Sequence, residues 1–190
     1  MLRLVALAVL ALALVPPVAA DTWRLDPETE IIVEVPWFGG RAIMRFPRYA
    51  GTVVFDENDL DRAAARIAVS ARDVRTGFAP ADALARSPGY LAATAHPEIT
   101  FTLDRIEQTS RTTADIKGSI TFRGVTRPMD FAATVFRYGP AAENPGRFEA
   151  GFDLAGEIDR TAFGSIQDVP AVAAVLPVRI RLLMVRDGGS

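Results

Sequence analysis

Side chains able to perform covalent or metal chemistry are scarce in this sequence. Its 190 residues include no cysteine and one histidine, His96. This composition excludes disulfides, cysteine nucleophiles and thiolate metal sites within the chain, and it leaves no metal site built from two histidines. A serine hydrolase would have to use His96 as its base, and the sequence has no Gly-x-Ser-x-Gly elbow to carry the nucleophile. We therefore expect no catalytic residue, no metal and no other cofactor.

The charged residues do not predict a nucleic-acid-binding surface. Basic residues number 21 and acidic residues 23, which gives a formal net charge of −2, and no basic run occurs. Nucleic acid is therefore not expected as a partner. The acidic stretch at residues 56–59 lacks the ligand spacing of a calcium loop, so we interpret it as a turn.

Two arginines are the best candidates for holding an anionic group. Arg160 lies shortly before Phe163, and Arg86 follows an alanine-rich stretch. A guanidinium can bind a phosphate or a carboxylate through two parallel hydrogen bonds. The alternative is structural, because Arg160 could instead donate to loop carbonyls at one end of the fold while Phe163 closes that end. The sequence leaves both interpretations open, and Arg86 poses the same choice.

These residues must be positioned by strands, because apolar and polar residues alternate along most of the chain. In the clearest case, apolar residues occupy every second position from Phe148 to Leu154. The pattern predicts about eight half-buried strands, separated by clusters of Gly, Asn, Asp and Pro. The expected strands are 31–35, 44–55, 66–74, 99–103, 116–122, 129–135, 148–154 and 178–184. The short stretch Gly124–Pro128 predicts an antiparallel hairpin.

One segment breaks the alternation. Residues 79–94 are rich in alanine, and Pro80 and Pro88 each stand where they can open a helical turn. We predict two short helices, 81–87 and 89–93, inserted between strands. The sequential strands themselves can close into a barrel or stack as a sandwich, and periodicity alone leaves both arrangements open.

The first twenty residues are predicted to be a secretory signal peptide. Arg3 precedes an apolar run at residues 4–15, and the small residues that follow at 18–20 form a cleavage site. An uncleaved anchor is the alternative, but a spanning helix needs about 20 apolar residues. We expect residues 21–190 to form a single domain that is periplasmic or secreted.

Seven motifs, in this order, give the chain a resemblance to a known family. They are Trp-Arg-Leu-Asp-Pro (23–27), Gly-Thr-Val-Val-Phe-Asp (51–56), Arg-Thr-Gly (75–77), Arg-Ser-Pro-Gly-Tyr-Leu (86–91), His-Pro-Glu-Ile-Thr-Phe (96–101), Gly-Ser-Ile-Thr-Phe-Arg-Gly-Val-Thr-Arg-Pro (118–128) and Asp-Arg-Thr-Ala-Phe-Gly (159–164). The chain resembles the YceI-like, or polyisoprenoid-binding, periplasmic proteins over nearly all of residues 21–190. The resemblance implies an all-β fold, a lipocalin-like eight-stranded antiparallel β-barrel with a short helical insert around residues 81–93.

The resemblance also implies a non-catalytic carrier that holds a polyisoprenoid or other long-chain lipid inside the barrel. The inward apolar residues that would contact this ligand are Phe101, Leu103, Ile120, Phe122, Phe131, Val135, Phe152, Leu154, Ile180 and Leu182. Arg86 and Arg160 would face its head group, and Phe163 would lie beside them. Each apolar residue can equally be ordinary core. Peripheral membrane contact and a homodimer are both compatible with such a carrier.

The chain departs from the family's pattern at two places. Where many members carry His-Ser just after the Asp-Pro, this chain has Thr29-Glu30. Where many carry a histidine in the helical insert, it has Leu84. If those histidines hold the polar end of a ligand in relatives, this chain recognises a different head group or none.

Other interpretations stay open from the sequence. A barrel packed solid would suit an envelope or stress-related interaction module without a small ligand. A hydrolase would need His96, or two distant carboxylates that converge in the fold. Trp37 and Phe38, at an expected turn, are either an exposed apolar tip that touches a membrane or partner, or aromatic residues folded back onto the barrel.

Overall fold

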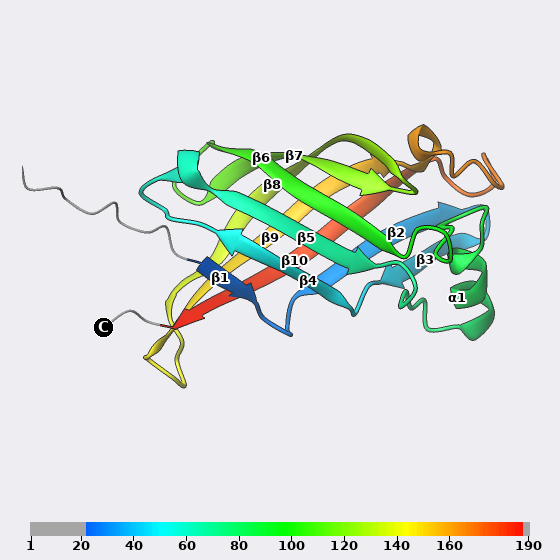
Figure 1. Cartoon of the computed structure of the whole chain (residues 1–190). Coiled ribbons are helices and arrows are strands. Elements are labelled where there is room, and N and C mark those ends of the chain that lie inside the picture. The colour runs from blue at the N-terminus through cyan, green and yellow to red at the C-terminus, as the bar shows by residue number, and fades with distance from the viewer. Residues whose placement is uncertain (1–21, 188–190) are drawn as a thin grey trace, which may run out of the picture.

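The computed structural model describes residues 22–187, which form mainly antiparallel strands rolled into a barrel (Figure 1). The predicted signal peptide, residues 1–20, lies outside the described residues. The strands are β1 (Thr22–Leu25), β2 (Glu30–Trp37), β3 (Gly40–Arg45), β4 (Tyr49–Val54), β5 (Ala64–Ser70), β6 (Glu98–Gln108), β7 (Thr113–Phe122), β8 (Val125–Pro140), β9 (Arg147–Asp159) and β10 (Val175–Asp187).

These ten segments occupy eight strand positions around the barrel. β1 and β2 both pair with β10, at Arg24↔Val185 and Val178↔Val33, so together they form one interrupted strand. β4 pairs with β1 and β3 pairs with β2, so these two form the next position. The order β4-β5-β6-β7-β8-β9-β10 then returns to β1 and closes the ring. The predicted eight-stranded antiparallel β-barrel is confirmed, and closure rules out the sandwich.

The early strands differ from the prediction in their limits. The strand predicted over 44–55 is divided, because β3 ends at Arg45 and β4 begins at Tyr49. Pro47 lies in the gap and has no N–H to donate to a ladder. The strand predicted over 66–74 begins at Ala64 and ends at Ser70. By contrast, the predicted hairpin is confirmed, since β7 and β8 pair across a tight turn at Arg123 and Gly124, both with positive φ.

The helical insert is smaller than predicted. It contains one α-helix, α1 (Ala79–Arg86), which begins two residues before the predicted start. The second helix predicted at 89–93 is a series of turns. Pro88 disfavours a helical conformation for Ser87, and Ala92 has a left-handed φ of 51° that interrupts any helix there. Two 3₁₀ turns complete the helices, η1 (Leu60–Arg62) and η2 (Arg160–Phe163).

The two ends of the barrel are built from different connections. The β5–β6, β7–β8 and β9–β10 connections, residues 71–97, 123–124 and 160–174, meet with α1 at one end, here called the helical end. Residues 55–63, 109–112 and 141–146 connect strands at the other, here called the hairpin end (Figure 1). No helix within residues 22–187 is long and apolar enough to cross a bilayer.

Candidate functional site

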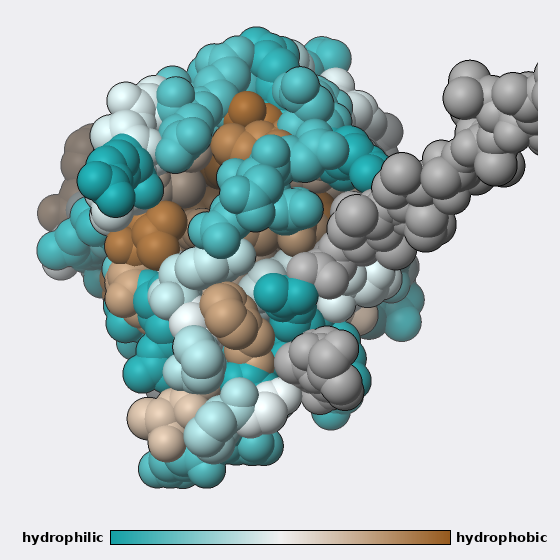
Figure 2. Space-filling model, turned by 90° about the vertical axis from the view of Figure 1, so that its left-hand side faces the viewer, coloured by the Kyte–Doolittle hydropathy of each residue, from teal (hydrophilic) through white to brown (hydrophobic). Residues whose placement is uncertain are grey.

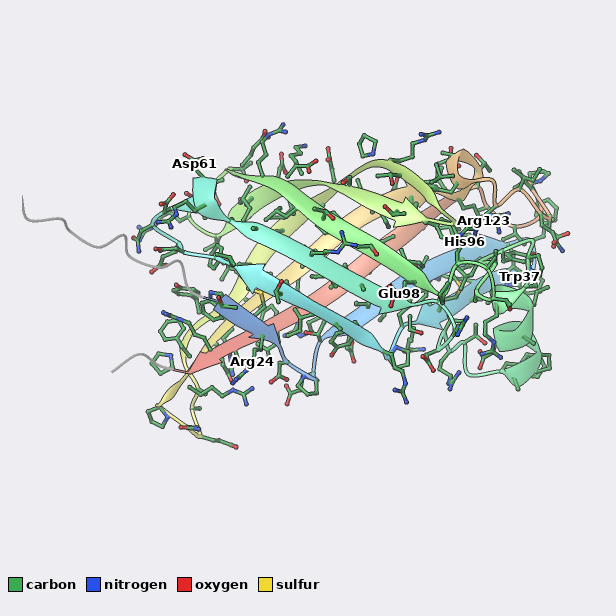
Figure 3. All side chains as sticks on the ribbon, in the orientation of Figure 1. Arg24, Trp37, Asp61, His96, Glu98 and Arg123 are labelled. Atoms are coloured by element: carbon green, nitrogen blue, oxygen red, sulfur yellow. The ribbon has the colours of Figure 1, made fainter. Side chains whose placement is uncertain are left out.

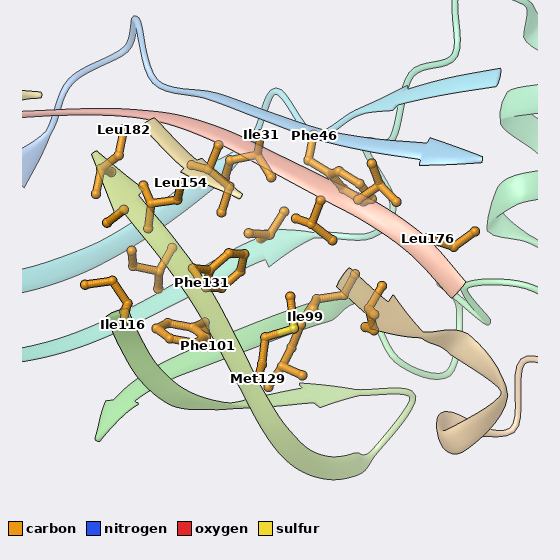
Figure 4. A pocket seen from close by; sticks show the side chains of 18 of the residues that line it. Ile31, Phe46, Ile99, Phe101, Ile116, Met129, Phe131, Leu154, Leu176 and Leu182 are labelled. Carbon is orange, nitrogen blue, oxygen red and sulfur yellow. The ribbon is translucent and has the colours of Figure 1, made fainter. Parts of the chain in front are cut away.

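The barrel encloses a cavity of about 1160 Å³, lined mainly by apolar side chains (Figure 4). Ligand pockets typically have volumes of about 300–1,000 Å³, so this one has room for a large molecule. The lining follows β10 from Leu176 to Met184. Eight steps of about 3.3 Å on a strand tilted by about 40° give a lined length of roughly 20 Å along the barrel axis. The cavity is therefore long as well as apolar.

Glycines in the wall help to keep the cavity open. A side chain at Gly118 would meet the ring of Phe101 at 2.4 Å, and one at Gly156 would meet the ring of Phe131 at 2.8 Å. Both rings therefore lie directly against backbone of the neighbouring strand. They also contact each other edge to face, with centroids 5.5 Å apart. A bulkier residue at either glycine would push its ring toward the middle of the barrel.

The predicted apolar residues all lie in the cavity lining. They are Phe101, Leu103, Ile120, Phe122, Phe131, Val135, Phe152, Leu154, Ile180 and Leu182. Sequence analysis missed the lining contributed by the first half of the chain, including Ile31, Val33, Met44, Ile67 and Val69. Their signal was present, because the same alternation runs through residues 31–35 and 64–69. The structure thus places apolar residues around the whole ring, with no end-to-end packing.

Arg160 is a structural residue in this fold. Its side chain is 3% exposed. Its Nε donates to the Ala173 carbonyl at 2.8 Å, Nη1 to Ser165 O at 2.8 Å, and Nη2 to the carbonyls of Gln167 and Val172 at 2.8 and 3.0 Å. Nη1 also lies 3.4 Å from Ser165 Oγ. Since the guanidinium has five N–H donors, these contacts leave none for a ligand phosphate or carboxylate.

The prediction of a head-group role for Arg160 therefore gives way to the structural alternative. Residues 160–174, here called the Arg160 loop, are folded around this one side chain. Arg86 lies in the last turn of α1 and is not part of the cavity lining. Phe163 is not part of it either, since its ring packs on Phe122 with centroids 5.4 Å apart. Both were predicted to be ligand-binding residues, and neither is part of the cavity lining.

A second set of contacts fixes the Arg160 loop to the residues after α1. Tyr90 donates a hydrogen bond to Asp168, and Arg160 lies over the Tyr90 ring at 5.6 Å. Burial and the Asp168 carboxylate raise the pKa of Tyr90 to about 12. Burial lowers the pKa of Arg160, while the nearby Asp168 opposes that shift. Arg123 completes the junction by donating to the carbonyls of Pro88, Tyr90 and Phe163.

Apart from Thr29, the charged and polar groups in the lining lie at the two ends of the cavity. Within residues 22–187, its titratable members are Tyr90, Arg160 and Asp168 at the helical end and Glu57, Arg111 and Tyr138 at the hairpin end. In the middle, Thr29 is the departure that faces the cavity. Its hydroxyl is already paired, donating to the Leu183 carbonyl and accepting from the Leu183 N–H, both at 3.0 Å. Leu84, the other departure, lines the helical end. The central cavity thus presents an almost wholly apolar wall.

His96 lies outside this cavity. Its ring packs beside Gly124, where an added Cβ would approach His96 Cε1 to 3.0 Å, near Arg123 at the helical end (Figure 3). It is absent from the lining residues. Within residues 22–187, no group of three or more His, Asp and Glu side chains is arranged to hold a metal ion. The cavity geometry therefore offers no support for the histidine-based hydrolase.

Comparison with known proteins gives a consistent match. The model of the YceI-like domain matches residues 23–184. A UPF0312 protein of Pectobacterium atrosepticum is 30% identical over 142 residues, which cover 70% of this chain and 72% of that protein. Protein YceI of Shigella flexneri is 30% identical over 125 residues, covering 65% and 63% of the two chains.

Solved structures share the fold at low sequence identity. BcnA of Burkholderia cenocepacia superposes with a TM-score of 0.73 at 18% identity, covering 84% of this chain and 98% of that one. A polyisoprenoid binding domain from Saccharophagus degradans superposes with a TM-score of 0.63 at 12% identity, covering 88% and 98%. These two neighbours support the barrel architecture.

Proposed function

This chain belongs to the YceI-like domain family, and from this premise we propose that it is a non-catalytic carrier of a polyisoprenoid or other long-chain lipid held inside its barrel. The observation that carries the proposal is the apolar cavity of about 1160 Å³ along the barrel interior. A solid barrel would have no place for a ligand, whereas this one has unfilled space bounded by hydrocarbon side chains. The description of the Saccharophagus degradans domain as polyisoprenoid-binding supports the ligand class.

An apolar wall is sufficient for useful affinity. Each buried methylene contributes about 0.8 kcal/mol, so about ten of them contribute roughly 8 kcal/mol, which corresponds to a Kd near 1 μM before the costs of association. Those costs are substantial, so a longer chain with more buried carbons is favoured. No specific polar contact is needed to reach this range, and the paired hydroxyl of Thr29 offers none.

The distribution of polar groups suggests how the ligand lies. An unpaired polar group in the central cavity would lose its bonds to water without replacement, which costs roughly 1–3 kcal/mol. A polar head group is therefore expected at an end of the cavity, with its hydrocarbon chain along the centre. Since the donors of Arg160 are all engaged, binding depends on the apolar chain more than on an anionic head group.

We also propose that the protein acts outside the cytoplasm, in the periplasm or as a secreted protein. The apolar run and small-residue site of residues 1–20 support export. A barrel without cysteine needs no disulfide in that oxidising environment.

The direct test is to purify the protein from its own host, without detergent, and to record native mass spectra before and after organic extraction. The expected result is a bound species whose mass matches a long-chain isoprenoid or other lipid and which extraction removes. The extracted protein should then bind an added polyprenol with one-to-one stoichiometry. An empty protein that takes up neither polyprenol nor fatty acid would overturn the proposal.

A further inference from the structure

Exposed apolar side chains gather at the helical end. The set consists of Trp37, Phe38, Phe78, Leu84, Ile166 and Val169, here called the apolar rim, with exposed fractions from 42% for Val169 to 85% for Phe38. They belong to the β2–β3 turn, to α1 with the residue before it, and to the Arg160 loop. Large exposed apolar patches on a soluble protein mark a site of contact with a membrane or a partner.

The segments that carry the apolar rim are joined to one another. The Phe38 N–H donates to the Ala171 carbonyl at 3.1 Å, and Trp37 pairs with Val172 in an isolated bridge. On the other side, the bond from Tyr90 to Asp168 ties the Arg160 loop to the turns after α1. The apolar rim is therefore carried by segments that are joined through backbone and side-chain hydrogen bonds, and not by three independent loops.

The apolar rim is continuous with the cavity. Trp37, Phe38 and Leu84 are both exposed and part of the cavity lining. Trp37 lies at the end of the barrel away from Asp61 (Figure 3). An apolar surface therefore extends from the lining out to solvent at the helical end, beside the polar lining residues Tyr90, Arg160 and Asp168.

The two ends also differ in charge. The three connections at the helical end carry five basic residues, Arg72, Arg75, Arg86, Arg123 and Arg160, and three acidic ones, Asp73, Asp82 and Asp168. The three at the hairpin end carry two basic residues, Arg62 and Arg111, and five acidic ones, Asp56, Glu57, Asp59, Asp61 and Glu143. These three connections are thus net basic although the chain is net acidic, and the buried Arg160 supplies one of their five positive charges. Figure 2, which faces the hairpin end, shows hydrophilic residues around several apolar ones.

A local charge excess lies close to Trp37. Glu34 forms ion pairs with both Arg41, at 2.6 Å, and Arg179, at 2.9 Å. One carboxylate therefore faces two guanidiniums. Arg41 stands opposite Pro36, next to the β2–β3 turn, and Arg179 stands opposite Ile32, farther along β2. Aromatic side chains flanked by basic groups favour the interface of an anionic bilayer.

We propose that the apolar rim docks the protein onto an anionic phospholipid bilayer, with the helical end of the cavity facing the membrane. The rim aromatics insert at the level of the lipid head groups, and the basic excess adds attraction to anionic lipid. The reason for docking rests on the proposed function, since only a carrier of a lipid ligand needs this end of the cavity to face a bilayer. The net acidic hairpin end then points toward water.

The test uses residues of the apolar rim that do not line the cavity. Phe78 and Ile166 are 65% and 68% exposed and lie outside the lining, so Phe78→Ser/Ile166→Ser alters the rim without altering the ligand site. Serine also suits residue 78, which is the N-cap of α1. Phe136→Ser is the matched control, because Phe136 is 37% exposed on the barrel wall, against Arg181.

Flotation with ligand-free vesicles of phosphatidylglycerol mixed into phosphatidylcholine should recover the wild-type chain. We expect Phe78→Ser/Ile166→Ser to weaken partitioning by about tenfold and Phe136→Ser to leave it nearly unchanged. Pure phosphatidylcholine and high salt should each reduce binding, because part of the attraction is electrostatic. Emission from Trp37 should shift to shorter wavelength on vesicles, since Trp23 is already buried, at 1% exposure.

Polyprenol binding in solution separates the two proposals. Phe78→Ser/Ile166→Ser should bind added polyprenol as the wild type does, so loss of flotation alone reports on docking. Docking is overturned if the wild type ignores both vesicle types, if the control loses as much binding as the double variant, or if light scattering shows the rim buried in a dimer that the double variant dissociates. Absence of polyprenol binding with intact flotation would overturn the proposed function and leave docking standing.

Discussion

The wall of the cavity and the Arg160 loop are built on opposite principles. The wall consists of many apolar side chains that come from every strand position, and its contact with a ligand is shared among them. In the Arg160 loop, by contrast, one guanidinium donates hydrogen bonds to four carbonyls, those of Ser165, Gln167, Val172 and Ala173. A binding surface of the first kind tolerates substitution at any one point, whereas a junction of the second kind depends on a single residue.

The largest expected effect comes from removing the centre of the Arg160 loop. Arg160→Ala leaves four buried or partly buried carbonyls without their donor, so we expect a loss of about 3–5 kcal/mol in the free energy of unfolding. Arg160→Lys should not restore it, because an ammonium lacks the planar fork that reaches several carbonyls at once. Urea unfolding followed by circular dichroism measures both.

Arg86→Ala is the matched control for this variant. Arg86 makes no comparable set of carbonyl contacts among the described residues, and its removal should change stability by no more than about 0.5 kcal/mol. Equal losses in Arg160→Ala and Arg86→Ala would show that the loop does not depend on one guanidinium.

Filling the cavity should affect ligand binding and leave the fold intact. Ala133 lines the cavity, while Ala132 is exposed on the outer face of the same strand. The indole of Ala133→Trp would occupy room needed by the ligand, and displacing about two methylenes costs roughly 1.6 kcal/mol, more than tenfold in Kd. Ala132→Trp should bind polyprenol with unchanged affinity. Titration of the delipidated variants with polyprenol measures both Kd values. Equal affinities in the two variants would show that the ligand does not bind in the barrel interior.

A single truncation in the wall should have a smaller effect. Leu154 lines the cavity and is only half-buried, so part of its side chain already lacks packing partners. We expect Leu154→Ala to cost about 1–2 kcal/mol of stability, less than the 2–5 kcal/mol usual for a packed core leucine. Its Kd for polyprenol should rise only a few-fold, because many other side chains share the contact. A loss of all binding would contradict the distributed wall, and Leu154→Met, which conserves volume, should behave as the wild type.

The same contrast explains what sequence could predict. Alternation in segments such as 148–154 encodes which face of a strand is inward, so the strands and ten lining residues followed from the pattern. The choice of a barrel over a sandwich did not follow from alternation and came from the resemblance to the YceI-like family. The direction of Arg160 did not, because its partners are backbone carbonyls of residues 165–173, and backbone atoms carry no sequence signal. The break in the strand predicted over 44–55 could have been predicted from Pro47, because proline has no N–H to donate to a ladder. The prediction followed the alternation through this residue instead.

The smallest expected effect tests the contact that closes the Arg160 loop. Tyr90 has its pKa raised to about 12 by burial and by Asp168, so the folded chain keeps a proton that the unfolded chain releases above pH 10. Stability should therefore fall as pH rises from about 10 to 12 and be insensitive to this group below that window.

Tyr90→Phe should lower the free energy of unfolding by only about 1 kcal/mol at neutral pH, the contribution of one partly exposed hydrogen bond. It should also reduce the loss of stability at alkaline pH. Some decline should persist, because burial also raises the pKa of Tyr49 and Tyr138. Urea unfolding at about pH 9.5 and 11.5 measures the change in the free energy of unfolding. For Asp168→Asn we expect a change between those of the wild type and Tyr90→Phe, because this variant removes the carboxylate and keeps the burial of Tyr90. An unchanged pH profile in Tyr90→Phe would mean that the contact between Tyr90 and Asp168 does not help to hold the Arg160 loop, which would make the contrast with the distributed cavity wall sharper still.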